Sequence, residues 1–295
     1  MAALSLIGTW IQRGVEAGFC RGSALLSNNL SKLRADRGIM YAAAMRSTML
    51  KALFLDMDET LCDTSRANEQ AKHLMGVALV DQYGAEFNGH LVADAYVAGL
   101  YRQWSDRQRA RYAPIIEEQN ESAFRLQLIC DLLADQGVEN VSETAAQTLQ
   151  DSFDRNRLQA FDFYPGIKEF LAEARKLFTL VVITNGPEFS QLPKLEVVNM
   201  AELVDHIIIG GQEPEQKPAR SIFEKALRLA NCEAHEAIHV GDNLATDIAG
   251  ARNSGIASIW IAHQQPLDAE LGIDPHHTLF HPSELPELIR GLHQR

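Results

Sequence analysis

The chain has 295 residues, of which 46% are hydrophobic and 22% are charged, and its formal net charge is −12 at pH 7. This length and apolar content suffice for a core with one inserted domain, and no apolar run is long enough for a transmembrane helix. The acidic balance argues against a nucleic-acid-coating protein or one that binds an anionic membrane surface. The composition therefore favours a soluble globular protein.

The cysteines Cys20, Cys62, Cys130 and Cys232 are scattered through the chain without paired spacing. Such spacing predicts reduced thiols and a cytoplasmic location. We expect Cys62 to be a packing residue, because no histidine partner lies near it in the sequence.

Residues 1–48 differ from the rest of the chain, mixing Leu, Ala and Gly with scattered Arg, Ser and Asn. Their apolar stretch, residues 2–10, has no basic region ahead of it, so a secretory signal is not expected. Met40, Met45 and Met49 offer alternative starts. This leader is expected to be either disordered or not translated.

The apolar run at residues 53–55 stops abruptly at Asp56, and Asp58 follows two positions later. Residues two apart on an extended chain point to the same side, so both carboxylates are predicted to face one site at a strand end. Such a pair repels unless a cation such as Mg²⁺ lies between the oxygens. Taken alone, the pair fits an exposed turn equally well, because short motifs recur by chance.

Residues 65–159 are predicted to be mostly helical and to interrupt the sheet. Apolar residues recur at intervals of three and four between Phe124 and Leu133, as in a helix with one buried face. Pro114 and Gly137 are predicted to punctuate the helices on either side.

The same region concentrates arginines and aromatic residues between positions 101 and 112. Arg102, Trp104 and Arg107 are candidate substrate-binding residues, because arginine pairs with carboxylates and phosphates and an aromatic ring stacks on a base. A solvated helix face with a few core aromatics is the favoured alternative, since charged residues generally stay exposed.

Two further apolar runs end in residues suited to phosphate. Residues 179–183 precede Thr184 and Asn185, whose hydroxyl and amide groups can bind phosphate oxygens, although the same residues also suit an ordinary turn. Residues 206–209 precede Lys217, which offers a positive charge held by a neighbouring proline. The alternative for a single lysine is a solvated side chain.

The apolar run at residues 237–240 leads into Asp242, and Asp247 follows. Asp247 also suits the first turn of the next helix, where acids are favoured. His239, inside the run, is predicted to be a satisfied core residue. In chain order, an acid pair, Thr, Lys and a further acid all follow strands that alternate with helices, which is how a parallel α/β sheet assembles a site at its carboxyl edge.

These residues resemble the four motifs of the haloacid dehalogenase (HAD) superfamily, most closely its phosphatase branch. The match spans residues 51–290. Residues 210–223 are also similar to the corresponding segment of N-acylneuraminate-9-phosphatases and pyrimidine-nucleotidase-like enzymes. The four motifs correspond to residues 56–60, Thr184-Asn185, Lys217-Pro218 and residues 241–247.

The resemblance implies a three-layer sandwich with a doubly wound parallel sheet and an inserted helical cap of the C1 type. The core would comprise residues 49–64 and 160–295, and the cap residues 65–159. The cap would close over the site and exclude water by moving at hinges near residues 62–65 and 162–166. A further strand at residues 258–262 and a closing helix at 283–292 would complete the core.

The resemblance also implies a mechanism. Asp56 would attack phosphorus and form an aspartyl-phosphate. Asp58 would protonate the leaving alkoxide and later deprotonate the attacking water. Mg²⁺ would be held by Asp56, Asp242 and the main-chain carbonyl of Asp58, with Asp247 assisting through water.

Thr184, the Asn185 amide and Lys217 would neutralise the phosphoryl oxygens. The expected partner is a small phosphorylated metabolite, such as a sugar phosphate or a nucleoside monophosphate, with neither nucleic acid nor membrane involved. The protein is expected to be a monomer or a homodimer.

Asp58 argues for a phosphatase and against the first alternative, a dehalogenase, because true dehalogenases lack the second acid and need no metal. Receiver-type signalling domains also carry strand-end acids, a Thr and a Lys, but they are shorter and gather their acids differently. A binding protein on the same fold is the third option, although none of the expected functional residues is missing.

Overall fold

The computed structural model describes residues 49–118, 121–267 and 272–294. The expected leader at residues 1–48, which includes Cys20, lies outside the described residues. Cys62, Cys130 and Cys232 are free thiols, and Cys62 is buried. The described fold therefore begins just before the first predicted strand.

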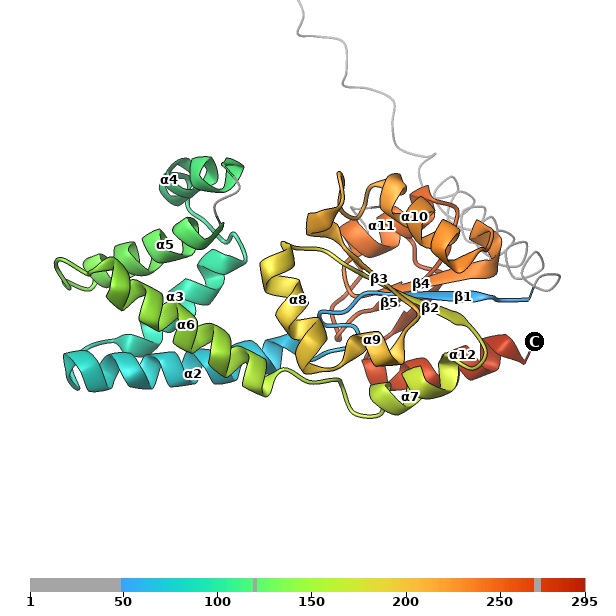
Figure 1. Ribbon diagram of the computed structural model, residues 1–295, viewed down its shortest axis with the longest axis horizontal. Coiled ribbons are helices and arrows are strands. Elements are labelled where there is room, and N and C mark those ends of the chain that lie inside the picture. The colour runs from blue at the N-terminus through green and yellow to red at the C-terminus, as the bar shows by residue number, and fades with distance from the viewer. Residues whose placement is uncertain (1–48, 119–120, 268–271, 295) are drawn as a thin grey trace, which may run out of the picture. The chain divides into compact units, whose positions relative to one another are not determined.

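Six strands of the described residues form one parallel sheet in the order β3-β2-β1-β4-β5-β6, of which β1 to β5 are labelled in Figure 1. The chain winds outward from β1 in both directions, so β1 lies at the point where the strand order reverses. This arrangement confirms the predicted α/β class with a doubly wound parallel sheet. The strands are β1 (Ala52–Leu55), β2 (Thr179–Thr184), β3 (His206–Ile209), β4 (Ala237–Gly241), β5 (Ala257–Ile261) and β6 (His277–Leu279).

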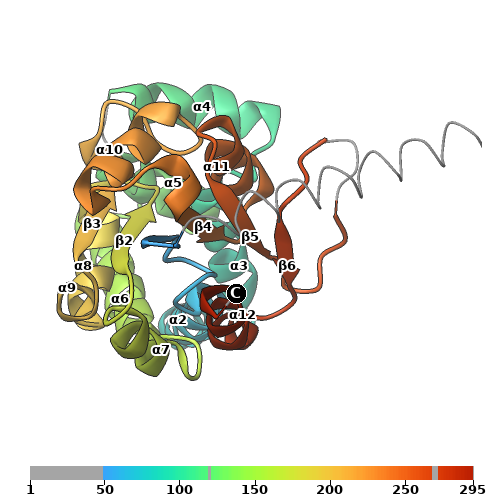
Figure 2. The ribbon, with the colours of Figure 1, turned by 90° about the vertical axis from the view of Figure 1, so that its right-hand side faces the viewer.

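Helices cover both faces of the sheet, and β1 is accordingly buried along its whole length. Figure 2 shows α10 (Arg220–Ala230) and α11 (Ala249–Asn253) on one side, and α7 (Ile167–Ala174) and α12 (Leu285–His293) on the other. Phe54 and Val181 pack against Phe223 of α10 in one apolar cluster. The other elements of this part are α8 (Glu188–Val197), α9 (Met200–Leu203), η1 (Gly210–Gln212), η2 (Ala234–Glu236), η3 (Leu244–Ile248) and η5 (Pro282–Glu284).

The C-terminal part follows the sequence-based expectation with one addition. The strand expected at residues 258–262 is β5, and the expected closing helix is α12. The short strand β6 lies in a stretch that the sequence did not mark, because three residues are too few to carry an alternating pattern.

The first five described helices after β1, α2 to α6, are here called the helical insertion (Figure 1). They enclose an apolar cluster of their own. Tyr96, Phe124, Leu128 and Phe153 lie fully buried in it. Pro114 lies inside α4 and not between helices, so that expectation was wrong; a helix tolerates a proline by giving up one backbone hydrogen bond. The helices are α2 (Thr64–Tyr83), α3 (Gly89–Leu100), α4 (Asp106–Glu117), α5 (Glu121–Asp135) and α6 (Glu143–Ala160).

The described residues include no helix that combines the length and the apolar character needed to cross a bilayer. The longest described helix of the insertion, α2, carries charged residues along its length.

Candidate active site

Three carboxyl side chains meet at the carboxyl ends of β1 and β4. Asp56 directly follows β1, Asp242 directly follows β4, and Asp247 lies in the π-helical turn η3. One oxygen of each lies within 4.8 Å of the others. Leu55 is in register with Val240, so the two strands end at the same edge of the sheet and bring the acids together.

Gly241, the last residue of β4, leaves room for Asp247. A Cβ atom at position 241 would lie 2.3 Å from Asp247 Cγ, which is closer than non-bonded carbons approach. Any larger residue would therefore push Asp247 away from the strand end.

Lys217 is 4% exposed and links two of the acids. Its Nζ lies 2.5 Å from Asp56 Oδ1 and 2.7 Å from Asp247 Oδ1. One ammonium group thus compensates part of the charge of a buried carboxylate cluster. We call Asp56, Lys217, Asp242 and Asp247 the strand-end cluster.

Asn185 holds the backbone of Lys217. Its side-chain Nδ2 donates to Lys217 O at 2.9 Å, and its Oδ1 accepts from Lys217 N at 3.0 Å. Both side-chain groups of Asn185 thus bind the backbone of Lys217 and fix the β2 end to the loop that carries the lysine. Thr184, the last residue of β2, is buried, and its hydroxyl makes one long bond, 3.4 Å, to Asn185 O.

The pKa values of the strand-end cluster show the effect of burying several carboxyl groups close together. Burial, together with repulsion from Asp247, raises the pKa of Asp56 to about 7, against the attraction of Lys217. Burial and repulsion from Asp56 raise the pKa of Asp242 to about 8. Although burial opposes it, Lys217 holds the pKa of Asp247 well below its usual range. Two of the three acids therefore lack sufficient positive charge around them.

His239 is buried in β4, as the sequence indicated, and it contacts the cluster. Its Nε2 lies 2.9 Å from Asp247 Oδ1. Burial lowers the pKa of His239, and an ionised carboxylate can only accept, so Nε2 carries the proton of the neutral ring. With Asn243 N at 3.2 Å from Asp247 Oδ2, both oxygens of Asp247 have protein donors.

Asp58 lies beside the cluster and is held by two residues. Lys194 Nζ is 2.9 Å from both carboxylate oxygens, and Thr64 Oγ1 donates to Oδ1 at 2.5 Å. Although burial opposes it, Lys194 lowers the pKa of Asp58. Lys194 is 4% exposed and lies inside α8, and the sequence analysis did not select it. The only sequence signal was a lysine on the buried face of a helix that follows the Thr184 strand.

Glu59 ties the two predicted hinge segments together. Its Oε1 accepts from Ser65 N at 2.5 Å and its Oε2 from the Tyr164 hydroxyl at 2.9 Å. Its backbone carbonyl lies 2.5 Å from His263 Nε2. Trp260 Nε1 donates to Asp242 O at 2.7 Å and fixes the loop that carries this acid.

The three candidate substrate residues of the insertion do not contact the strand-end cluster. Arg102 pairs with Glu121 at 2.6 Å, and its guanidinium lies over the ring of Trp104. Trp104 Nε1 donates to Gly99 O at 2.9 Å. Arg107 is exposed. Arg102 and Trp104 thus have packing partners within the insertion.

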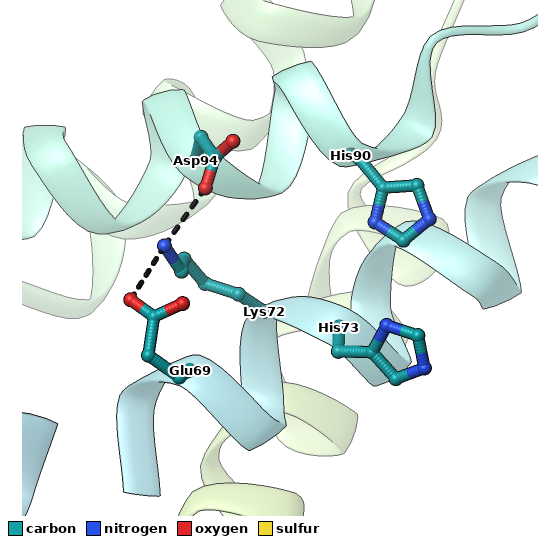
Figure 3. A pocket seen from close by; sticks show the side chains of 5 residues that line it. All are labelled: Glu69, Lys72, His73, His90 and Asp94. Carbon is teal, nitrogen blue, oxygen red and sulfur yellow. Dashed lines mark ion pairs between the residues drawn. The ribbon is translucent and has the colours of Figure 1, made fainter. Parts of the chain in front are cut away.

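A second concave site lies between α2 and α3 of the insertion (Figure 3). Lys72 Nζ lies 2.7 Å from Glu69 Oε1 and 2.8 Å from Asp94 Oδ1, and the rings of His73 and His90 stack with centroids 5.6 Å apart. The ammonium group already has two acid partners, so the site is a surface ion-pair network of the kind that contributes little to stability.

Comparison with known proteins agrees with the motifs. Residues 50–255 match the family model for haloacid dehalogenase-like hydrolases. Human N-acylneuraminate-9-phosphatase is 25% identical over 84% of this chain and 97% of its own length. Glyceraldehyde 3-phosphate phosphatase of Pyrococcus furiosus is 25% identical over 82% of this chain and 93% of its own.

A solved 2-haloacid dehalogenase of Pseudomonas syringae has a TM-score of 0.54 at 25% identity, covering 82% of this chain and 99% of that one. The fold is therefore shared by proteins named for different reactions, and the residues at the strand ends must distinguish them. The family match covers most of the described fold, and the chain belongs to the haloacid dehalogenase-like hydrolases.

Proposed function

We propose that the protein is a Mg²⁺-dependent phosphomonoester hydrolase that acts through an aspartyl-phosphate at Asp56. The observation that carries the proposal is the second acid, Asp58, held by Lys194 and Thr64 beside a cluster of three carboxylates. A dehalogenase has no use for this acid or for a metal, so the arrangement favours phosphate chemistry over the dehalogenase alternative.

The strand-end cluster suits Mg²⁺. Carboxylate oxygens are the ligands this ion prefers, and Asp56 and Asp242 have raised pKa values that a divalent cation would lower. Asp56, Asp242 and the main-chain carbonyl of Asp58 would hold it, and Asp247 would act through water because both its oxygens have donors already. The bound ion would supply charge neutralisation at the phosphoryl oxygens.

The residues of the chain can divide the reaction between them. Asp56 would attack phosphorus, while Lys217, Thr184 and the Asn185 N–H bind the phosphoryl oxygens. Asp58 would protonate the leaving oxygen and later take a proton from the attacking water. Lys194 favours the ionised form of Asp58, which is the form required in that second step.

The substrate class that we propose is a small phosphorylated metabolite, with sugar phosphates as the first choice. The relatives named for N-acylneuraminate 9-phosphate and glyceraldehyde 3-phosphate support it. The helical insertion would act as the cap and select the alcohol part of the ester, because the strand-end residues recognise only the phosphate.

The test is phosphate release from a panel of sugar phosphates, acidic sugar phosphates and nucleoside monophosphates, with Mg²⁺ and with EDTA. We expect metal-dependent turnover, and a loss of roughly 10⁴-fold or more in Asp56→Asn because the nucleophile is removed. Asp81→Asn, an exposed aspartate of α2, is the matched control. Metal-independent dechlorination of 2-chloropropionate without phosphate release would overturn the proposal.

A further inference from the structure

Arg157, in the last turn of α6, is a buried guanidinium without an acid partner. It is 8% exposed, and its Nη2 makes one long hydrogen bond, 3.5 Å, to Ser190 Oγ of α8. Its Nε has no hydrogen-bond partner, and no carboxylate of the described residues lies within ion-pair distance. Arg125, the other buried arginine, by contrast has Asp154 at 3.4 Å.

An uncompensated charge is expensive to bury, so a buried guanidinium normally has a carboxylate or phosphate beside it. Arginine also offers several donors in a fixed planar fork that matches an anion with two oxygens. Arg157 therefore has the form of an anion-binding group whose partner comes from outside the chain.

Arg157 lies close to the proposed reaction centre. Ser190 is one turn before Lys194 on α8, and Lys194 binds Asp58. Arg157 and Lys194 thus meet at α8, and only Lys194 has a carboxylate partner, which leaves the positive charge of Arg157 for an incoming anion.

Other buried polar atoms on α2, α3 and α6 also lack hydrogen-bond partners. Asn68 lies one turn after Thr64 on α2, and Gln150 lies two turns before Arg157 on α6, so each is on the same helix face as a residue of this region. Asn68 Oδ1, Gln150 Oε1 and the Tyr96 hydroxyl have no partner among the described residues. We call Asn68, Tyr96, Gln150 and Arg157 the polar wall.

We propose that the polar wall is a subsite for a second anionic group on the alcohol part of the phosphate ester, with Arg157 as the residue that binds it. The group is a carboxylate or a second phosphate, and the polar wall offers neutral hydrogen bonds to the atoms beside it. This inference rests on the proposed phosphatase function and adds the chemical class of the substrate.

The experiment compares esters that differ only in the second group. The carboxylate arm pairs 6-phosphogluconate with glucitol 6-phosphate, and 3-phosphoglycerate with glycerol 3-phosphate. The phosphate arm pairs fructose 1,6-bisphosphate with fructose 6-phosphate. We expect kcat/KM of the parent to favour the doubly anionic member of one arm, and Arg157→Gln to reduce that preference about 10- to 100-fold, the value of a charge-assisted contact.

Arg157→Lys keeps the charge but not the planar fork and should recover part of the preference. Arg155→Gln, an exposed arginine of the same helix, is the control and should retain the parent's preference. No preference in the parent, or the same preference in parent and Arg157→Gln, would overturn the proposal. An equal loss on both members of a pair would assign Arg157 to the transferred phosphoryl group instead.

Two further readouts separate this inference from the phosphatase proposal. In Asp56→Asn, 6-phosphogluconate should raise Tm more than glucitol 6-phosphate does. Adding the Arg157→Gln substitution should remove this difference in Tm. The same comparison of fructose 1,6-bisphosphate with fructose 6-phosphate tests the phosphate arm. Stabilisation that does not depend on Arg157 in either arm would count against the subsite even if esters are hydrolysed. Without ligand, Arg157→Gln should unfold at the parent's denaturant concentration or above it, whereas a structural arginine would lower that midpoint.

Discussion

The strand-end cluster and the polar wall are both buried and polar, but they differ in how their groups are satisfied. In the cluster, Lys217 bridges Asp56 and Asp247, and each oxygen of Asp247 has a donor. In the polar wall, Arg157 has no acid partner and three neutral atoms have no hydrogen-bond partner among the described residues. The strand-end cluster is therefore organised by its own residues, whereas the polar wall keeps unpaired groups that, in our proposal, a ligand completes.

The largest effect on stability is expected when the positive charge that compensates the acids of the strand-end cluster is removed. Lys217→Met removes the ammonium group between Asp56 and Asp247, and should lower the free energy of unfolding of the metal-free protein by about 3–5 kcal/mol. Urea unfolding in EDTA measures it. Lys225→Met, which removes a partly exposed lysine paired with Glu213, should change it by less than about 1 kcal/mol. Equal effects for the two lysines would contradict the role given to Lys217.

The next effect is the pH dependence of metal binding. Asp56 and Asp242, with pKa values of about 7 and 8, bind more protons in the folded metal-free protein than in the unfolded chain, so their contribution to stability falls as pH rises from about 4 to 8. Mg²⁺ needs the ionised acids and should therefore stabilise more at pH 8.5 than at pH 6, by up to about 2.7 kcal/mol at one hundred times its Kd.

Thermal unfolding at several pH values, with Mg²⁺ and with EDTA, measures this linkage. A stabilisation by Mg²⁺ that is the same at pH 6 and pH 8.5 would mean that the ion binds elsewhere than at these acids.

A smaller effect on stability is expected from a substitution that disturbs the close packing of Gly241 against Asp247. Gly241→Ala places a methyl group against Asp247 and should reduce stability by about 1–3 kcal/mol and weaken Mg²⁺ binding. Gly291→Ala, in α12 with open space around it, should instead stabilise by about 0.5–1 kcal/mol. Calorimetric unfolding and Mg²⁺ titration of both variants provide the comparison, and unchanged Mg²⁺ affinity in Gly241→Ala would contradict it.

The sequence predicted the parallel sheet and the positions of Asp56, Asp58, Lys217, Asp242 and Asp247, because each of these residues lies in the segment that follows a strand. Strands of a parallel sheet share one carboxyl edge, so a position along the chain translates into a position in space. Their roles as nucleophile, acid and metal ligands stay predictions.

Residues that helices bring to the site were not predictable in the same way. Lys194 and Arg157 lie inside amphipathic helices, where a charged residue ordinarily faces water. Only the packing of α6 and α8 shows that both are buried near Asp58. The candidates Arg102 and Trp104 were chosen from composition, and the structure gives both of them packing partners within the insertion.

The hydrogen bond from Trp260 to the carbonyl of Asp242 has an optical consequence. Indole emission responds to the polarity and motion of its surroundings, and this indole is tied to the loop that bears a strand-end acid. The other tryptophan of the described residues, Trp104, is bonded to Gly99 inside the helical insertion. The two parts of the fold thus each carry an intrinsic fluorophore. Once Trp10 is replaced by Phe, ion loading at the strand ends and rearrangement of the insertion can be followed separately in Trp104→Phe and Trp260→Phe proteins.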